Sequence, residues 1–318
     1  MKGIKSGDRT VLSRAITLIE SARAEHAKQA QDIIEQCLPA TGDSIRIGIT
    51  GVPGVGKSTF IETLGNYIIE KGRKLAVLAI DPSSTRSGGS ILGDKTRMET
   101  LANNPDAFIR PSPTAGSLGG VARKTRETIY LCEAAGYDTI FIETVGVGQS
   151  ETAVHSMVDF FLLLMLAGAG DELQGMKRGI FEMADAIAIN KTDDMPEKQV
   201  QRAVREYKNA LHLYPPAESG WEPQVTTCSA LEETGITEIW IMIEESISLV
   251  KENGFFEMNR KKQARHWMYE SIHQHLKDDF YDNASVKKAL EKTENQVLNG
   301  QISSFKAARK LLDIYRNS

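Results

Sequence analysis

The residues best suited to chemistry lie in one glycine-rich run, Gly51-Val52-Pro53-Gly54-Val55-Gly56-Lys57-Ser58, which matches the pattern Gly-x-x-x-x-Gly-Lys-Ser. An isoleucine-rich run at 45–50 precedes it and predicts a buried strand, while residues 59–64 open a helix. In this setting a glycine-rich loop turns backbone N–H groups toward an anion at the positive end of a helix. We therefore expect Lys57 at the β- and γ-phosphates of a nucleotide and Ser58 at Mg²⁺.

Three acidic residues fall where the remaining magnesium ligands are expected. Asp81 follows the apolar run 75–80, and Glu143 follows the apolar run 139–142. Ligands gather at the carboxyl ends of parallel strands, so both carboxylates suit a metal shell. Asp94 is a second candidate near Mg²⁺ on weaker grounds. The alternatives are a turn residue before a proline for Asp81 and a solvated loop acid for Asp94.

The segments that follow these acids are polar and rich in glycine. Residues 83–90 are either a plain surface loop or a loop that orders around a γ-phosphate, and their position beside Asp81 favours the second. Gly146 comes three residues after Glu143, as expected of an N–H that senses the γ-phosphate. Gln149 either orders an attacking water or hydrogen-bonds within its own loop, and the second interpretation is favoured.

A second motif predicts which base is bound. Asn190-Lys191-Thr192-Asp193 follow the apolar run 186–189. A carboxylate at Asp193 can accept from both the ring N–H and the exocyclic amine of guanine, a donor pair that adenine lacks. The stem of Lys191 can lie along the base. Residues 228–231, Cys228-Ser229-Ala230-Leu231, can support the O6 side of guanine, with Cys228 itself more typical of a packing residue. The alternative is an ordinary turn between a strand and a helix.

Composition bounds the class of protein. The chain has 318 residues, 41% of them apolar and 25% charged, which is typical of a globular protein, and its net charge of −4 argues against a general nucleic-acid binder. Three scattered cysteines, with no Cys-x-x-Cys pair or histidine cluster, predict reduced thiols in a cytoplasm. The N-terminus lacks the apolar segment of a signal peptide, and the run 160–169 is too short to span a bilayer.

These patterns predict an α/β fold, a mostly parallel P-loop sheet flanked by helices. We expect an N-terminal helical segment at 1–42, a nucleotide domain at 43–252 and a C-terminal helical arm at 253–318. Residues 260–268 mix bases with aromatics on a helix; nucleic acid is one interpretation, and a solvated face in a subunit contact is favoured. Helices beyond the last strand often cover another subunit.

Four motifs, residues 51–58, 81–84, 143–151 and 190–193, resemble the ArgK/MeaB family of P-loop GTPases, which belongs to the G3E group of the SIMIBI class. The resemblance covers nearly the whole chain, and the run Glu-Thr-Val-Gly-Val-Gly-Gln-Ser-Glu is highly specific. It implies a GTPase chaperone of an adenosylcobalamin-dependent acyl-CoA mutase, chiefly methylmalonyl-CoA mutase. Such proteins gate delivery of the B12 cofactor, protect the mutase from inactivation and form homodimers through the C-terminal arm.

The resemblance also implies Mg²⁺ contacts from Ser58, Asp81, Asp94 and Glu143, guanine contacts from Asp193 with Ser229-Ala230-Leu231, and slow intrinsic hydrolysis that the partner accelerates. The catalytic candidates, taken with the motifs above, are Lys57, Glu143 and Gln149. Expected contacts to GTP or GDP are Gly51, Val52, Pro53, Gly54, Val55, Gly56, Lys57, Ser58, Thr59, Gly146, Asn190, Lys191, Asp193, Cys228, Ser229, Ala230 and Leu231. No membrane or nucleic-acid partner is expected.

Three rival functions stay open at this point. One is a kinase that phosphorylates a transport substrate-binding protein, an older label attached to this family. Another is a nucleotide-gated scaffold without meaningful turnover. The third is a metal-delivering G3E GTPase; such relatives often carry histidine-rich stretches or a Cys-x-Cys-Cys-type site, and this sequence has neither.

Overall fold

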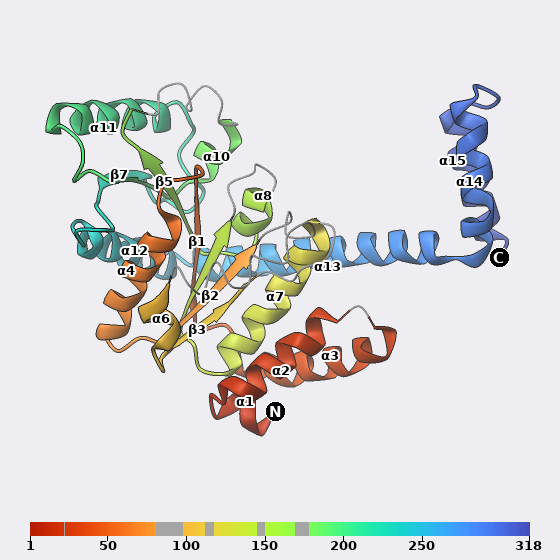
Figure 1. The fold of residues 1–318 in the computed structure, drawn as a ribbon, viewed down its shortest axis with the longest axis horizontal. Coiled ribbons are helices and arrows are strands. Elements are labelled where there is room, and N and C mark those ends of the chain that lie inside the picture. The colour runs from red at the N-terminus through yellow and green to blue at the C-terminus, as the bar shows by residue number, and fades with distance from the viewer. Residues whose placement is uncertain (22, 81–97, 112–117, 145–149, 169–177) are drawn as a thin grey trace. The chain divides into compact units, whose positions relative to one another are not determined.

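A parallel sheet forms the centre of the nucleotide-binding part of the chain (Figure 1). The computed structural model describes residues 1–21, 23–80, 98–111, 118–144, 150–168 and 178–318. Among them, seven strands pair in the order β3-β2-β4-β1-β5-β6-β7, and every pairing is parallel. The strands are β1 Ile45–Gly51, β2 Leu75–Ile80, β3 Ala107–Arg110, β4 Thr139–Thr144, β5 Phe160–Leu166, β6 Ala186–Asn190 and β7 Gln224–Thr227. The predicted α/β fold is confirmed.

The central strands are mostly apolar and almost entirely buried because helices cover both faces of the sheet. All seven residues of β1 are buried, and so are the first six of β5. Such strands appear in a sequence as continuous apolar runs, without the alternation of a half-exposed strand. For this reason the run 75–80 predicts β2 to the residue, and the predicted strand at 224–227 matches β7.

Helices connect successive strands and carry the rest of the core. In chain order they are α4 Lys57–Glu70, α6 Glu99–Asn103, α7 Leu118–Ala134, α8 Ser150–His155, α10 Arg178–Met183, α11 Glu197–Leu211 and α12 Ile236–Glu252. The main apolar core joins α4 and α12 to the sheet, with Phe60, Leu64, Trp240 and Ile243 at most 3% exposed. This packing fixes α4, the helix that begins at the predicted phosphate loop.

The N-terminal segment is helical, as predicted. It comprises α1 Lys2–Lys5, α2 Arg9–Glu20, α3 Ala24–Cys37 and the 3-10 turn η1 Leu38–Ala40. Asp8 caps α2, since its carboxylate accepts from the N–H groups of Thr10 at 2.8 Å and Val11 at 3.1 Å. The buried face of α2, with Leu12 and Ile16, packs this segment next to α7 (Figure 1).

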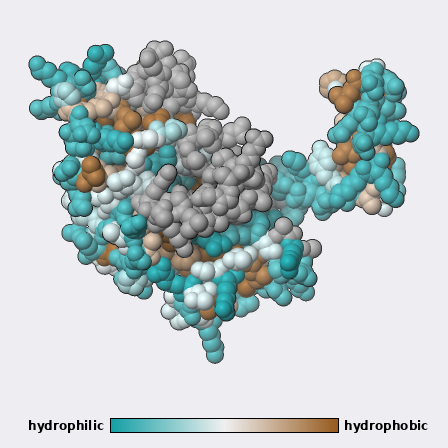
Figure 2. All heavy atoms as spheres, in the orientation of Figure 1, coloured by the Kyte–Doolittle hydropathy of each residue, from teal (hydrophilic) through white to brown (hydrophobic). Residues whose placement is uncertain are grey.

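The chain divides into two compact units, residues 1–263 and residues 264–318. The boundary falls inside α13, Phe255–Asp282, which α14 Ala284–Leu298 and α15 Ser304–Arg316 follow. In the second unit α14 and α15 pack against each other as a hairpin, and Asn283 and Ser303 cap their first turns. Figure 2 shows a mostly polar surface on this hairpin. Within the described part of the chain, the helices are all too short or too polar to cross a bilayer.

Candidate nucleotide-binding site

The glycine-rich loop connects β1 to α4 in the predicted way. β1 ends at Gly51, and Gly56, with φ of 91°, is the N-cap of α4. A side chain at Gly51 would place its Cβ 2.5 Å from the carbonyl oxygen of Leu164 in β5, which no ordinary contact allows. A Cβ at Gly56 would lie 3.0 Å from Nδ2 of Asn190. Glycine is therefore required at both ends of the loop, by close approach and by backbone conformation.

Between those glycines the loop has two buried residues and two exposed residues. Val52 and Val55 are buried, whereas Pro53 and Gly54 are exposed. Ser58, in the first turn of α4, is half-buried, and Thr59 is exposed. The valines thus hold the loop to the core, and the backbone between them faces solvent at the N-terminus of α4, where the helix dipole favours an anion.

Lys57 lies against the loop carbonyls. Its ammonium donates to the carbonyl oxygens of Gly51 at 2.9 Å and Val52 at 3.3 Å. Burial lowers the pKa of Lys57, while the nearby carboxylates of Glu143 and Glu151 act in the opposite direction and raise it. The cation is therefore placed among acceptors, at the edge of the sheet where a polyanion would be bound.

Glu143 reaches this edge from β4, the neighbour of β1. It is the penultimate residue of β4, half-buried, and in register with Ile49 of β1. One residue further, the hydroxyls of Thr144 and Thr50 are 2.6 Å apart and join the two strand ends. The structure thus brings Lys57, Ser58 and Glu143 to one edge of the sheet. Asp81, Asp94, Gly146, Gln149 and the loop 83–90 lie outside the described residues.

Three neighbours of this site were not singled out from the sequence. Thr50 and Thr144 are fully buried polar residues at the carboxyl ends of mostly apolar strands, and this placement is the signal that could have found them. Glu151 is 1% exposed and contributes to the electrostatic field at Lys57. A buried acid in a six-residue helix gives a weaker signal in the sequence, because the surroundings of its side chain depend on the fold.

The second motif is hydrogen-bonded to the phosphate loop through Asn190. Asn190, at the end of β6, is 1% exposed. Its Nδ2 donates to the carbonyl oxygen of Val55 at 2.8 Å, and its Oδ1 accepts from the N–H of Ala230 at 3.0 Å and from the thiol of Cys228 at 3.6 Å. One side chain therefore holds together the phosphate loop and the segment after β7, which are far apart in sequence.

Residues 190–193 and 228–231 lie together, and we call them the base corner. The N–H and hydroxyl of Thr192 both donate to the carbonyl oxygen of Cys228, at 3.3 and 3.1 Å. Lys191 has φ of 60°, and its Cε is 3.6 Å from the Cβ position of Gly56, so its stem runs beside the loop. Asp193 is exposed, as is Leu231 at 72%.

The predicted residues of the 228–231 segment divide into buried and exposed members. Ser229 is 1% and Ala230 4% exposed, and the Ala230 carbonyl oxygen accepts from the hydroxyl of Thr63 on α4 at 2.8 Å. Burial raises the pKa of the Cys228 thiol to about 12, which confirms the expectation of an unreactive packing residue. The corner can therefore present Lys191, Asp193 and Leu231 to a planar base over a fixed backbone.

The parallel sheet and the glycine-rich loop between β1 and α4 define a P-loop nucleoside triphosphatase fold. Residues 12–285 match the family described as Methylmalonyl Co-A mutase-associated GTPase MeaB. The chain belongs to this family, as its resemblance predicted, and is a GTPase that binds GTP and GDP.

Individual relatives span almost the whole chain. It is 50% identical over 311 residues to a protein of Mycobacterium tuberculosis H37Rv named as a probable GTPase, covering 98% of this chain and 93% of that protein. It is 43% identical over 325 residues to the mouse mitochondrial methylmalonic aciduria type A homolog, covering 99% and 78%. A crystal structure described as a LAO/AO transport system kinase has a TM-score of 0.77 at 36% identity, covering 99% and 96%.

Proposed function

We propose that this chain hydrolyses GTP with Mg²⁺ as the chaperone of an adenosylcobalamin-dependent acyl-CoA mutase, with methylmalonyl-CoA mutase as the first candidate. The match of residues 12–285 to the mutase-associated GTPase family carries the choice of partner. The link from Val55 through Asn190 to Ala230 supports the nucleotide assignment, because it holds the phosphate loop beside the base corner. In this function the chaperone controls cofactor loading and protects the mutase.

We place the triphosphate over residues 51–59, with Lys57 at the β- and γ-phosphates and Asp193 at the guanine edge. The backbone N–H groups of the loop and the N-terminus of α4 bind phosphate oxygens, and Lys57 neutralises charge that develops on them. Asp193 selects guanine, since its carboxylate would face no donor pair on adenine. Lys191 and Leu231 flank the base, while Asn190, Cys228, Ser229 and Ala230 hold the corner.

Mg²⁺ would be held by the hydroxyl of Ser58 and the carboxylates of Asp81, Asp94 and Glu143. The donor set fits the ion, because Mg²⁺ prefers hard oxygen ligands. Ser58 lies on α4, which follows β1, and Glu143 lies near the end of β4, which pairs with β1. When bound, Mg²⁺ neutralises charge between the β- and γ-phosphates. Gly146 would sense the γ-phosphate, and Gln149 is a candidate for ordering water.

Nucleotide state would reach the mutase through residues 83–94 and 146–151, whose contacts with the nucleotide hydrolysis would change. The functional organisation would be a helical segment at 1–42, the GTPase domain at 43–252 and a dimerisation arm at 253–318. Exposed apolar residues on α13 support a homodimer, since Met268, Tyr269, Ile272 and Leu276 are 45–57% exposed and recur at helical spacing. A cytoplasmic location fits these roles.

A pull-down from native cytoplasm, with and without a non-hydrolysable GTP analogue, tests the proposed partner. We expect recovery of a B12-dependent mutase, in an amount that depends on the nucleotide. The variant Lys57→Ala is the matched control, because it should lose the nucleotide dependence along with tight GTP binding. Recovery of no mutase in either nucleotide state, from a wild-type chain that binds GTP normally, would refute the chaperone assignment.

A second candidate is a protein kinase activity, favoured by the likeness to the structure described as a LAO/AO transport system kinase. A kinase would transfer the γ-phosphate of a labelled nucleotide to a protein acceptor. Hydrolysis would release the same label as free phosphate. Label that stays on a transport-binding protein after denaturation supports the kinase, and label found only as free phosphate excludes it.

A further inference from the structure

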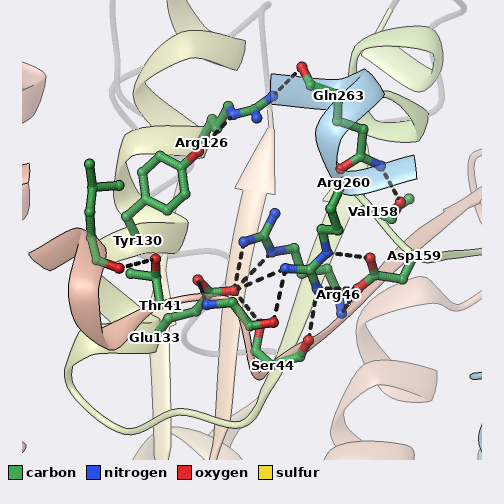
Figure 3. Close-up of polar contacts among 12 residues, drawn as sticks. Thr41, Ser44, Arg46, Arg126, Tyr130, Glu133, Val158, Asp159, Arg260 and Gln263 are labelled. Carbon is green, nitrogen blue, oxygen red and sulfur yellow. Dashed lines mark hydrogen bonds and ion pairs between the residues drawn. The ribbon is translucent and has the colours of Figure 1, made fainter. Parts of the chain in front are cut away.

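Four buried charged residues form a cluster at the amino-terminal edge of the sheet, shown in Figure 3. Arg46 is the second residue of β1, Asp159 directly precedes β5, Glu133 lies in the last turn of α7, and Arg260 lies in the second turn of α13. We call these four residues the buried charge cluster. Because β1 runs from Arg46 to the phosphate loop at Gly51, the cluster and the nucleotide site occupy opposite edges of one sheet.

The cluster is held by charge-assisted hydrogen bonds, and its Arg260–Asp159 pair is bidentate. The guanidinium of Arg260 donates to both oxygens of Asp159, each at 2.6 Å, and the N–H of Arg46 donates to the same carboxylate at 2.8 Å. Two nitrogens of the Arg46 guanidinium donate to Glu133 Oε1, at 2.9 and 2.7 Å, and the hydroxyl of Ser44 donates to that oxygen at 2.5 Å. The Arg260 guanidinium also lies 3.7 Å from Glu133.

The cluster is balanced in charge and largely shielded from solvent. Its two cations and two anions have side chains that are 2–4% exposed, or 12% for Arg260. Burial alone would lower the pKa of Arg260, but Asp159 and Glu133 raise it above its ordinary value, so the guanidinium stays charged. The forked Arg260–Asp159 pair fixes orientation as well as distance, and removal of one partner would leave the other charge without its direct counter-ion.

A second set of contacts joins α7 to the same part of α13. The Arg126 guanidinium donates to the carbonyl oxygen of Gln263 at 3.2 Å. The Gln263 amide donates to the carbonyl oxygen of Val158, next to Asp159, at 2.7 Å. α7 has 17 residues and is about 25 Å long. It follows the carboxyl end of β3 and returns to the amino edge, so it spans the sheet from the nucleotide side to the cluster.

We propose that the buried charge cluster couples the nucleotide site to α13. In this arrangement the nucleotide at the phosphate loop changes the conformational freedom of residues 255–263, and the attachment of those residues changes nucleotide affinity in return, since coupling between two sites is reciprocal. β1 and α7 are the elements that reach from the nucleotide edge to the cluster. This coupling rests on the proposed binding of GTP at the phosphate loop. It does not depend on which partner protein the chain serves.

Hydrogen exchange on the full-length chain tests this coupling, with GDP or with a non-hydrolysable GTP analogue and Mg²⁺. We expect amides in 255–263 to exchange at rates that differ about five-fold or more between the two nucleotides, a factor within the usual range of allosteric coupling. In Arg260→Met this difference should disappear, and the ratio of GTP-analogue to GDP affinity should change by the same factor. Arg260→Lys, which keeps the charge without the fork, should fall between the two.

Lys262→Met is the matched control, because Lys262 lies on α13 like Arg260 and forms an ion pair with Glu218, a residue between α11 and β7. The side chains of this pair are 60% and 71% exposed. It should keep the nucleotide-dependent exchange difference. If Arg260→Met alone fails to fold, the double variant Asp159→Asn with Arg260→Met decides, since asparagine retains an acceptor for the Arg46 N–H. Equal exchange in both nucleotides in the wild-type chain, or an undiminished difference in the folded variant, would overturn the proposal.

Discussion

Replacing Asn190 by alanine tests how the site is held together. The variant loses the hydrogen bonds to the carbonyl of Val55 at 2.8 Å and from the N–H of Ala230 at 3.0 Å, in a place where Asn190 is 1% exposed. Each buried backbone group left without a partner costs about 1–3 kcal/mol. Lys191 and Asp193 beside it are exposed, so water can reach part of the space that the amide leaves. We therefore expect the two backbone groups together to cost about 2–3 kcal/mol, near the low end of that range.

This free energy should appear chiefly as weaker nucleotide binding, because the two loops would no longer be held in position for the ligand. A loss of about 2–3 kcal/mol corresponds to roughly a 30- to 150-fold rise in Kd. GTP and GDP should be affected equally, since the base corner is common to both. The assay is titration with fluorescent GTP and GDP analogues, accompanied by urea unfolding to confirm that the variant is folded.

Asn66→Ala is the control, since the Asn66 amide on α4 donates to the Thr100 hydroxyl on α6 in an exposed pair. It should bind both nucleotides as the wild-type chain does. An Asn190→Ala protein that folds and binds GTP within about three-fold of wild type would show that this side chain does not hold the site, since three-fold corresponds to about 0.6 kcal/mol and the expected loss is about 2–3 kcal/mol.

Three further predictions follow from named contacts. Gly51→Ala should abolish nucleotide binding in filter or fluorescence assays, because its Cβ would lie 2.5 Å from the Leu164 carbonyl oxygen, and retained affinity would contradict the loop geometry. Burial and the carboxylate of Asp159 raise the pKa of Asp185 to about 7, although the hydrogen bond from the N–H of Phe161 lowers it. Because the folded pKa lies above the unfolded value of 3.8, the contribution of Asp185 to the free energy of unfolding is fully present below pH 3.8 and is lost as pH rises through 7. Asp185→Asn should therefore raise the free energy of unfolding by about 1–3 kcal/mol at pH 8 and by little near pH 4, measured in urea; equal effects at both pH values would refute the assignment. Ile272→Asp with Leu276→Asp should shift the chain from dimer to monomer in sedimentation, whereas an unchanged mass would count against α13 as the dimer contact.

The strands and the nucleotide motifs could be predicted because their signals are local. A strand covered on both faces needs apolar residues throughout, as in β5. The phosphate loop needs its glycines within eight residues of Lys57, and the tetrad from Asn190 to Asp193 follows directly from a strand. The specific contacts of Asn190 to Val55 and Ala230 depend on the fold, since those partners are 135 and 40 residues away.

The sequence interpretation was wrong for Arg260. Its cluster of bases and aromatics predicted a solvated helix face, and Lys261, Lys262 and Arg265 are exposed as expected. Arg260, however, is ion-paired with Asp159, which is 101 residues away, and its side chain is 12% exposed. A charged residue gives no local sign that a distant acid will be buried beside it, so a buried charge pair of this kind appears only once the sheet and helices are assembled.

Selection of guanine through Asp193 is the central claim, and competition binding measures it most directly. GTP and ATP should be titrated in the presence of Mg²⁺ against the wild-type chain and against Asp193→Ala. We predict that the wild-type chain prefers GTP by about 100-fold or more, because ATP offers no donor pair to the Asp193 carboxylate. The variant should lose most of this preference, since it lacks that carboxylate. Equal affinity of the wild-type chain for the two nucleotides, or a preference for GTP that survives in Asp193→Ala, would contradict the account.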